Sequence, residues 1–204
     1  MSTLQDPALL WYVNRAAGFV LLVLLTLATA LGISAVDRRT RPRPGPPGER
    51  RSRPVGRFPG FVLPELHRRV ALVAVALTVL HIVPAVLDDY VPIDWLDVFV
   101  PFASDYRALW LGLGTVSFDV LAVVVVTALL RARLGPASWK VVHRSVYVVW
   151  PLAVLHVVGM GTDVDGLGGW LALGCVLVVV TACCLRLRSM RASDRSRRPS
   201  AVRR

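Results

Sequence analysis

Long apolar blocks separate the hydrophilic segments of this chain, and they constrain its fold more than any other feature. Several blocks reach the roughly 20 apolar residues that a helix needs to cross about 30 Å of hydrocarbon. A soluble domain rarely carries such runs, and 55% of the 204 residues are hydrophobic. We therefore predict an all-α membrane protein, a bundle of about five transmembrane helices. The expected spans are residues 9–36, 63–87, 108–130, 139–160 and 167–185.

The charges between the spans predict which side of the membrane each segment faces. Lys and Arg accumulate in cytoplasmic segments, and with five spans all the basic segments of this chain fall on one side. We expect the N-terminal segment, residues 1–8, to lie outside and the C-terminus to lie in the cytoplasm. The tail, residues 186–204, is basic and Ser-rich, and we expect it to be disordered. The basic segments are residues 37–60, 131–140 and 186–204; the acidic ones are residues 88–107 and 161–166.

The net charge of +11 comes from 23 Arg and one Lys, Lys140, set against 13 acidic residues. These cations lie mainly between and after the apolar blocks, without a basic–aromatic recognition motif, so we expect contact with membrane lipid and no nucleic-acid binding. The three cysteines share one apolar block and are expected to be small buried hydrophobes. The Arg-rich usage and the absence of a signal peptide suggest the plasma membrane of a bacterium. The cysteines are Cys175, Cys183 and Cys184.

All four histidines of the chain lie on two of the expected spans. His67 and His81 are fourteen residues apart on the second, and His143 and His156 are thirteen apart on the fourth. Both spans run outward from the cytoplasm, so His67 and His143 share the inner level, and His81 and His156 the outer. Fourteen helical residues rise about 20 Å. One imidazole from each helix at each level would supply the two axial ligands of a haem iron.

Two other interpretations of the histidines remain. They could be isolated residues that hydrogen-bond neighbouring helices. A zinc site is the weaker metal prediction, because no carboxylate or Cys joins a His at either level. The thirteen-residue spacing also needs an explanation, since an ideal helix falls about 140° short of a full repeat over that distance. Pro151 lies between His143 and His156 and can kink the helix.

Two sequence segments resemble a known family, the ferric reductase-like transmembrane domain. They are HRRVALVAVALTVLH on the second span and WKVVHRSVYVVWPLAVLH on the fourth. That family includes the membrane parts of ferric reductases and NADPH oxidases, and the haem subunit of a bacterial methionine sulfoxide reductase system. The resemblance covers roughly residues 9–185. It implies two b-type haems, the inner one bound by His67 and His143 and the outer one by His81 and His156.

The resemblance also implies transmembrane electron transfer from a cytoplasmic or membrane donor to an outer acceptor. The chain differs from the larger family members, which have six spans and a domain that binds FAD and NADPH. We therefore expect the donor to be a separate flavoprotein or a quinol. The acceptor could be a ferric chelate, oxygen, a quinone or a partner reductase. Two alternatives stay open: a single-haem membrane anchor subunit of a reductase, and a haem-free membrane scaffold or transporter subunit.

Other polar and aromatic residues on the spans are secondary candidates. Arg15 lies near the outer end of the first span, where it could pair with a haem propionate or anchor the helix at the interface. The family that the chain resembles has a comparable Arg on this span. Trp150 lies midway between His143 and His156, and we favour packing over a role in electron tunnelling. Asp119 is expected to hydrogen-bond within the bundle. The other candidates are Arg107 at the outer level, Arg68, Arg69, Lys140 and Arg144 as inner anchors, and Asp163 and Asp165 as solvated loop acids.

Overall fold

The computed structural model describes residues 7–40, 61–89, 91–162 and 165–197. Five helical segments in these ranges are long and apolar enough to cross a membrane. This confirms the predicted fold class, an all-α membrane bundle of about five spans. In the described ranges the helices are α1 (Pro7–Thr40), α2 (Val62–Leu87), α3 (Trp95–Phe99), α4 (Ala108–Leu129), α5 (Pro136–Arg144), α6 (Val146–Met160) and α7 (Leu167–Arg197).

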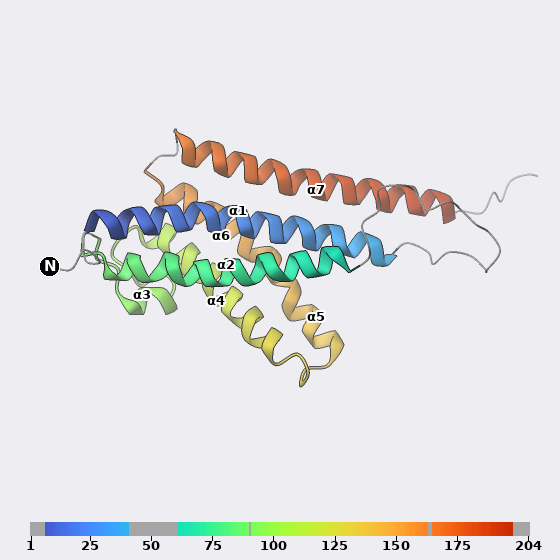
Figure 1. Cartoon of the computed structure of the whole chain (residues 1–204), viewed down its shortest axis with the longest axis horizontal. Coiled ribbons are helices and arrows are strands. Elements are labelled where there is room, and N and C mark those ends of the chain that lie inside the picture. The colour runs from blue at the N-terminus through green and yellow to red at the C-terminus, as the bar shows by residue number, and fades with distance from the viewer. Residues whose placement is uncertain (1–6, 41–60, 90, 163–164, 198–204) are drawn as a thin grey trace, which may run out of the picture.

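The helices form two hairpins that face each other. Helix α1 packs along α2 in the first, and α4 packs along α6 in the second, while α7 lies against α1 on the other side from α2 (Figure 1). Helix α1 also contacts α6 and so joins the two hairpins. In Figure 1, α5 and the C-terminal half of α4 diverge from the long α1–α2 pair.

The spans bury few side chains within the chain itself. Their apolar residues are exposed on most sides, as expected for helices whose neighbours include lipid. A small core forms where α1, α6 and α7 meet. It centres on Leu22, Ala172 and Cys175, and Trp150 and Val154 pack against it. Cys175 is therefore buried, as predicted, whereas Cys183 and Cys184 are exposed at the surface of α7.

Two helices extend beyond the expected spans. Helix α1 continues to Thr40, and α7 continues to Arg197. The prediction of a disordered tail is therefore wrong for residues 186–197. Once a helix exists, each added residue gains a hydrogen bond, and Arg, Leu, Met and Ala are good helix formers. The first six residues, the rest of the 37–60 loop and residues 198–204 lie outside the described ranges, and the orientation of the chain stays a prediction.

The fourth span is two helices rather than one. Helix α5 ends at Arg144, Ser145 forms a turn, and α6 begins at Val146. The amide of Ser145 donates to the carbonyl of Val142 over 3.0 Å. The amide of Val148 in turn donates to the carbonyl of Ser145 over 2.9 Å. These three-residue bonds are those of a 3₁₀ helix. Pro151, where the sequence suggested a kink, lies inside α6.

The connection between α2 and α4 carries the short helix α3. Asp94 and Asp97 form a capping box at its start. The hydroxyl of Thr115 on α4 donates to the carbonyl of Asp97 over 2.7 Å and fixes α3 to the bundle. Trp95 and Phe99 keep more than half of their side-chain surface exposed, as expected for aromatic residues at a membrane surface.

Candidate functional site: two facing histidine pairs

The outer pair consists of His81 on α2 and His156 on α6. Their ring centroids lie 6.3 Å apart, and the ring planes cross at 86°. The two residues belong to opposite hairpins and are 75 positions apart in the chain. The bundle therefore brings together, at one level, the two imidazoles that the sequence assigns to the outer level.

The inner pair consists of His67 on α2 and His143 on α5. Their ring centroids lie 6.0 Å apart, again with an interplanar angle of 86°. The same helix α2 thus supplies one imidazole to each level. The structure places all four histidines in the pairs that the sequence predicts, while their role as haem ligands stays a prediction.

A distance of 6 Å between ring centroids leaves room for one metal ion between the rings. An imidazole nitrogen lies about 2 Å from a bound transition metal, and the ring centre lies about 1 Å further away, so two ligands on opposite sides place their centroids about 6 Å apart. Among the described residues, no group of three or more His, Cys, Asp or Glu side chains is placed to bind a metal. Two axial ligands are the number that a porphyrin-bound iron takes from a protein.

Backbone carbonyls set the tautomer of three of these imidazoles. The Nδ1 of His81 lies 3.0 Å from the carbonyl oxygen of Asn14, and the Nδ1 of His67 lies 3.0 Å from that of Ala28. The Nδ1 of His156 lies 2.9 Å from the carbonyl oxygen of Trp110. A carbonyl only accepts, so Nδ1 carries the hydrogen in each case. The lone pair is then on Nε2, which is the arrangement of a metal-binding histidine.

The side chain of Asn14 holds the outer pair a second way. The side-chain Nδ2 of Asn14 donates to the backbone carbonyl of His81 over 2.6 Å, while the backbone carbonyl of Asn14 accepts from the His81 ring. This double link ties α1 to α2 at the level of the outer pair. Sequence reasoning missed Asn14, although an amide in an otherwise apolar span was a visible signal.

An apolar cavity of about 900 Å³, part of it open, adjoins the outer pair. Both outer imidazoles line it, as do two glycines, Gly18 of α1 and Gly114 of α4. The lining is mainly aliphatic and aromatic, which suits the apolar faces of a macrocycle. It includes Leu21, Leu25, Ile82, Leu111, Phe118 and Val149.

The turn at Ser145 lies between the two imidazoles of the fourth span. A 3₁₀ turn rotates each residue by about 120° rather than 100°. Three residues in this geometry therefore add about 60° to the rotation between His143 and His156. This rotation offsets part of the deficit of a thirteen-residue spacing. The two rings can thus approach the same helix, α2, at different levels.

Cations surround both levels, and several have partners within the chain. Arg15 donates to the hydroxyl of Thr162 over 3.1 Å, and its guanidinium carbon lies 5.2 Å from the ring centroids of Trp11 and Phe19. It is not among the residues that line the outer cavity. Arg107 donates to the carbonyl of Gly159 over 2.7 Å, at the C-terminal end of α6.

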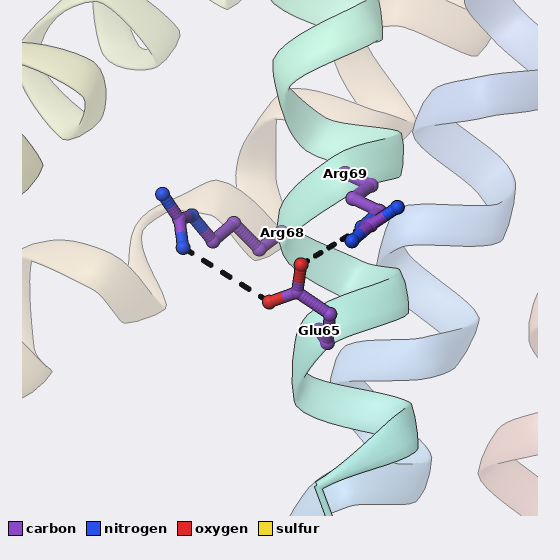
Figure 2. Close-up of polar contacts among 3 residues, drawn as sticks. All are labelled: Glu65, Arg68 and Arg69. Atoms are coloured by element: carbon purple, nitrogen blue, oxygen red, sulfur yellow. Dashed lines mark hydrogen bonds and ion pairs between the residues drawn. The ribbon is translucent and has the colours of Figure 1, made fainter.

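Near the start of α2, Glu65, Arg68 and Arg69 form an ion-pair cluster (Figure 2), and these residues flank His67 in the sequence. The Nε of Arg69 donates to Glu65 over 2.8 Å, and Arg68 lies 4.0 Å from the same carboxylate. Both Arg side chains are largely exposed. Lys140 and Arg144 on α5 are also exposed. These residues fit the predicted role of anchors at the membrane surface.

The two remaining intramembrane candidates differ in their surroundings. Trp150 packs against the core between α1, α6 and α7, as the sequence favoured. Asp119 is half-buried on α4, and no hydrogen bond or ion pair of its carboxylate is found within the described part of the chain. The expected hydrogen bond of Asp119 is therefore absent there. Asp165 is exposed, and Asp163 lies outside the described residues.

Comparison with known proteins places the central part of this chain in a family. Residues 50–154 match the family model described as ferric reductase like transmembrane component. The matched region contains His67, His81 and His143 and ends two residues before His156. The matched region is shorter than residues 9–185, the range over which the sequence led us to expect the resemblance. No curated protein and no solved structure matches the chain.

Proposed function

This chain belongs to the ferric reductase-like transmembrane family, whose model covers half of its length, and from that premise we propose that it carries electrons across a membrane through two b-type haems. The family indicates transmembrane electron transfer as a class of activity. The two haems, their ligands and the direction of transfer are our proposal. The inner haem would be held by His67 and His143, and the outer one by His81 and His156.

One observation carries this proposal: two pairs of imidazoles face each other from different helices at the distance that a shared metal ion requires. Histidines that merely joined helices would hydrogen-bond a neighbouring helix, but they would not need a second imidazole facing them at this distance. Here the two rings of each pair are too far apart for a direct hydrogen bond, with centroids at 6.0 and 6.3 Å. Three of the rings direct Nδ1 to a carbonyl of the helix beside their own.

The chain's contribution to the activity is to bind, orient and shield. When bound, haem supplies reversible one-electron chemistry. One imidazole from each helix would hold the haem iron at each level, which would leave no open position for an acceptor to bind the iron directly. The carbonyls of Asn14, Ala28 and Trp110 hold three rings in the tautomer that binds metal. The mainly apolar lining of the outer cavity would shield a bound haem from water.

The proposed partners follow from the orientation that the charges predict. The donor is a separate flavoprotein on the cytoplasmic side or a quinol within the membrane. The acceptor is on the outer side and is a ferric chelate, oxygen, a quinone or a partner reductase. The chain is a multi-pass membrane protein, and we propose that the membrane is the cell membrane, as in a bacterium.

The test is a reduced-minus-oxidised absorption spectrum of the purified full chain, with the haem-to-protein ratio measured on the same sample. We expect the bands of b-type haem and two haems per chain. One haem per chain would select the alternative in which this protein is the membrane anchor of a reductase. A colourless protein that stays colourless after incubation with haem would overturn the proposal in favour of a scaffold or transporter subunit.

A further inference from the structure

Helix α1 carries a fourteen-residue repeat that matches the repeat of histidines on α2. The carbonyl of Asn14 accepts from His81, and that of Ala28, fourteen residues later, accepts from His67. A glycine follows each carbonyl residue by four positions: Gly18 lies against the ring of His81, and Gly32 lies against that of His67. Because α1 and α2 run in opposite directions, the earlier repeat on α1 meets the later histidine on α2.

The four-residue offset has a physical reason. In an α-helix the carbonyl of residue i accepts the amide of residue i+4, and the side chain at i+4 stands beside that carbonyl. Thr26 shows the effect in this chain, since its hydroxyl donates to the carbonyl of Leu22 over 2.7 Å. A glycine at i+4 has no side chain, so an imidazole from a neighbouring helix can reach the second lone pair.

Helix α4 repeats the arrangement at the outer level. The carbonyl of Trp110 accepts from His156, and Gly114 follows four residues later. A Cβ placed on Gly114 would lie 2.5 Å from Nδ1 of His156, and one on Gly18 would lie 3.0 Å from Cε1 of His81. The outer level therefore has both of its imidazoles fixed by a carbonyl and closely packed against a glycine.

Within the described ranges, the fourth histidine, His143 at the inner level, lacks this combination of a carbonyl and a glycine on the neighbouring helix. Fourteen residues beyond Trp110 and Gly114, helix α4 has Val124 and Ala128. The carbonyl of Val124 accepts from the hydroxyl of Thr127 over 3.0 Å, and a methyl group stands at residue 128. The Nδ1 of His143 is buried and has no hydrogen-bond partner among the described residues.

His143 is also held by a less continuous backbone than the other three histidines. It lies on the nine-residue helix α5, two residues before the turn at Ser145. Besides facing His67, its ring stacks on that of Trp139, with the two ring centroids 4.9 Å apart. This stacking restrains the ring plane but does not fix the tautomer.

We infer that the two haem sites differ in how firmly they hold haem, and that the inner haem exchanges more readily. Both outer imidazoles are fixed by a backbone carbonyl with a glycine four residues later, whereas only one of the two inner imidazoles is fixed in this way. This inference rests on the proposed function. Gly18 and Gly114 are positioning residues: they act on the haem through His81 and His156. Losing an outer-shell partner of a metal ligand costs roughly 10- to 100-fold in metal affinity, and His143 lacks such a partner.

The experiment follows haem transfer from the full chain in detergent to an excess of apomyoglobin, by absorbance. We expect two phases of equal amplitude whose rates differ by about tenfold or more. His143→Ala should remove the fast phase. Gly114→Ala should accelerate the slow phase by roughly 10- to 100-fold and shift the low-spin ferric EPR signal of the outer haem, because that signal depends on the angle between the imidazole planes.

Gly174→Ala is the matched control, since a Cβ at Gly174 on α7 would meet nothing within 4 Å. It should leave both phases unchanged. If Gly114→Ala does not yield folded protein, Gly18→Ala, with its milder contact, serves for the same slow phase. Two haems that leave at one common rate, or a Gly114→Ala variant that accelerates only the fast phase, would overturn this inference while leaving the proposed function intact. Haem-free protein that takes up no haem would overturn both.

Discussion

Trp150 donates a hydrogen bond from its indole Nε1 to the hydroxyl oxygen of Thr26 over 2.9 Å. This bond joins α6 to α1 between the two histidine levels. It therefore links the second hairpin to the first. The hydroxyl of Thr26 is held in position for this bond because it donates its own hydrogen to the carbonyl of Leu22. The indole lies in the core between α1, α6 and α7 and does not line the outer cavity.

We expect Trp150→Phe to destabilise the bundle without removing either haem. The loss of one interhelical hydrogen bond should cost about 0.6–1 kcal/mol, in line with polar contacts between membrane helices. Denaturant titration of the full chain in mixed micelles measures this change. Thr26→Val tests the other partner, and a double-mutant cycle isolates the bond from the change in side-chain volume. A large loss of haem in Trp150→Phe would contradict a purely structural role.

The histidine pairs predict which substitutions act on the same cofactor. His67→Ala and His143→Ala should each remove the inner haem, and His81→Ala and His156→Ala should each remove the outer one. Haem content should fall from two to one per chain in every case, and the remaining absorption spectrum should be the same within each pair. Low-temperature spectra of the purified variants measure this. The pairing would be refuted by a single substitution that empties both sites, or by different remaining spectra within one pair.

Much of the fold and the pairing of the histidines could be predicted from the sequence, because both depend on simple periodicity. Apolar runs of about 20 residues define spans, and the similar spacings of fourteen and thirteen residues on two parallel spans place His67 beside His143 and His81 beside His156. The glycine spacing was equally visible, since Gly18 and Gly32 are fourteen residues apart, like His67 and His81. Whether these glycines face the histidines depends on how α1 is rotated about its axis relative to α2, and the periodicity of the sequence does not predict that rotation.

The break in the fourth span could not be predicted in its position. Pro151 is the residue that removes a helical hydrogen bond, yet the turn lies at Ser145, six residues earlier. Ser145 supports the turn with its own hydroxyl, which donates to the carbonyl of Val142 over 2.7 Å. Serine competes for backbone groups in this way in helices and turns alike, so its presence alone does not locate a break.

Arg15 connects the outer end of α1 to the segment before α7 through Thr162. We expect Thr162→Val to lower the melting temperature of the purified chain by about 2–4 °C, for a loss of roughly 1 kcal/mol in a chain of this size. Arg15→Gln should lower it by at least as much, because it also removes the contacts of the guanidinium with Trp11 and Phe19. The midpoint potential of the outer haem should stay the same in both variants. A shift of that potential in Arg15→Gln alone would instead place the guanidinium at a haem propionate.

Asp119 is the twelfth of the 22 residues of α4, close to the middle of the span. A carboxylate at the centre of a transmembrane helix costs about 2.5–3.5 kcal/mol on insertion scales. No hydrogen bond or ion pair within the described part of the chain offsets that cost. We therefore expect Asp119→Leu to favour membrane insertion of the α4 segment by about 3 kcal/mol, measured as the fraction glycosylated in a microsomal insertion assay.

Asp119→Glu, which keeps the charge, is the matched control and should leave insertion of the segment nearly unchanged. In the full chain, Asp119→Leu should keep both haems, because within the described residues the carboxylate makes no hydrogen bond to any of the four histidines. Loss of the outer haem in Asp119→Leu, with insertion improved, would show that the acid acts on the site through a neighbouring residue. Such a result would give a functional reason for an acidic residue that makes insertion of α4 less favourable, because Asp119 would then stabilise the outer haem site to which α4 contributes the carbonyl of Trp110.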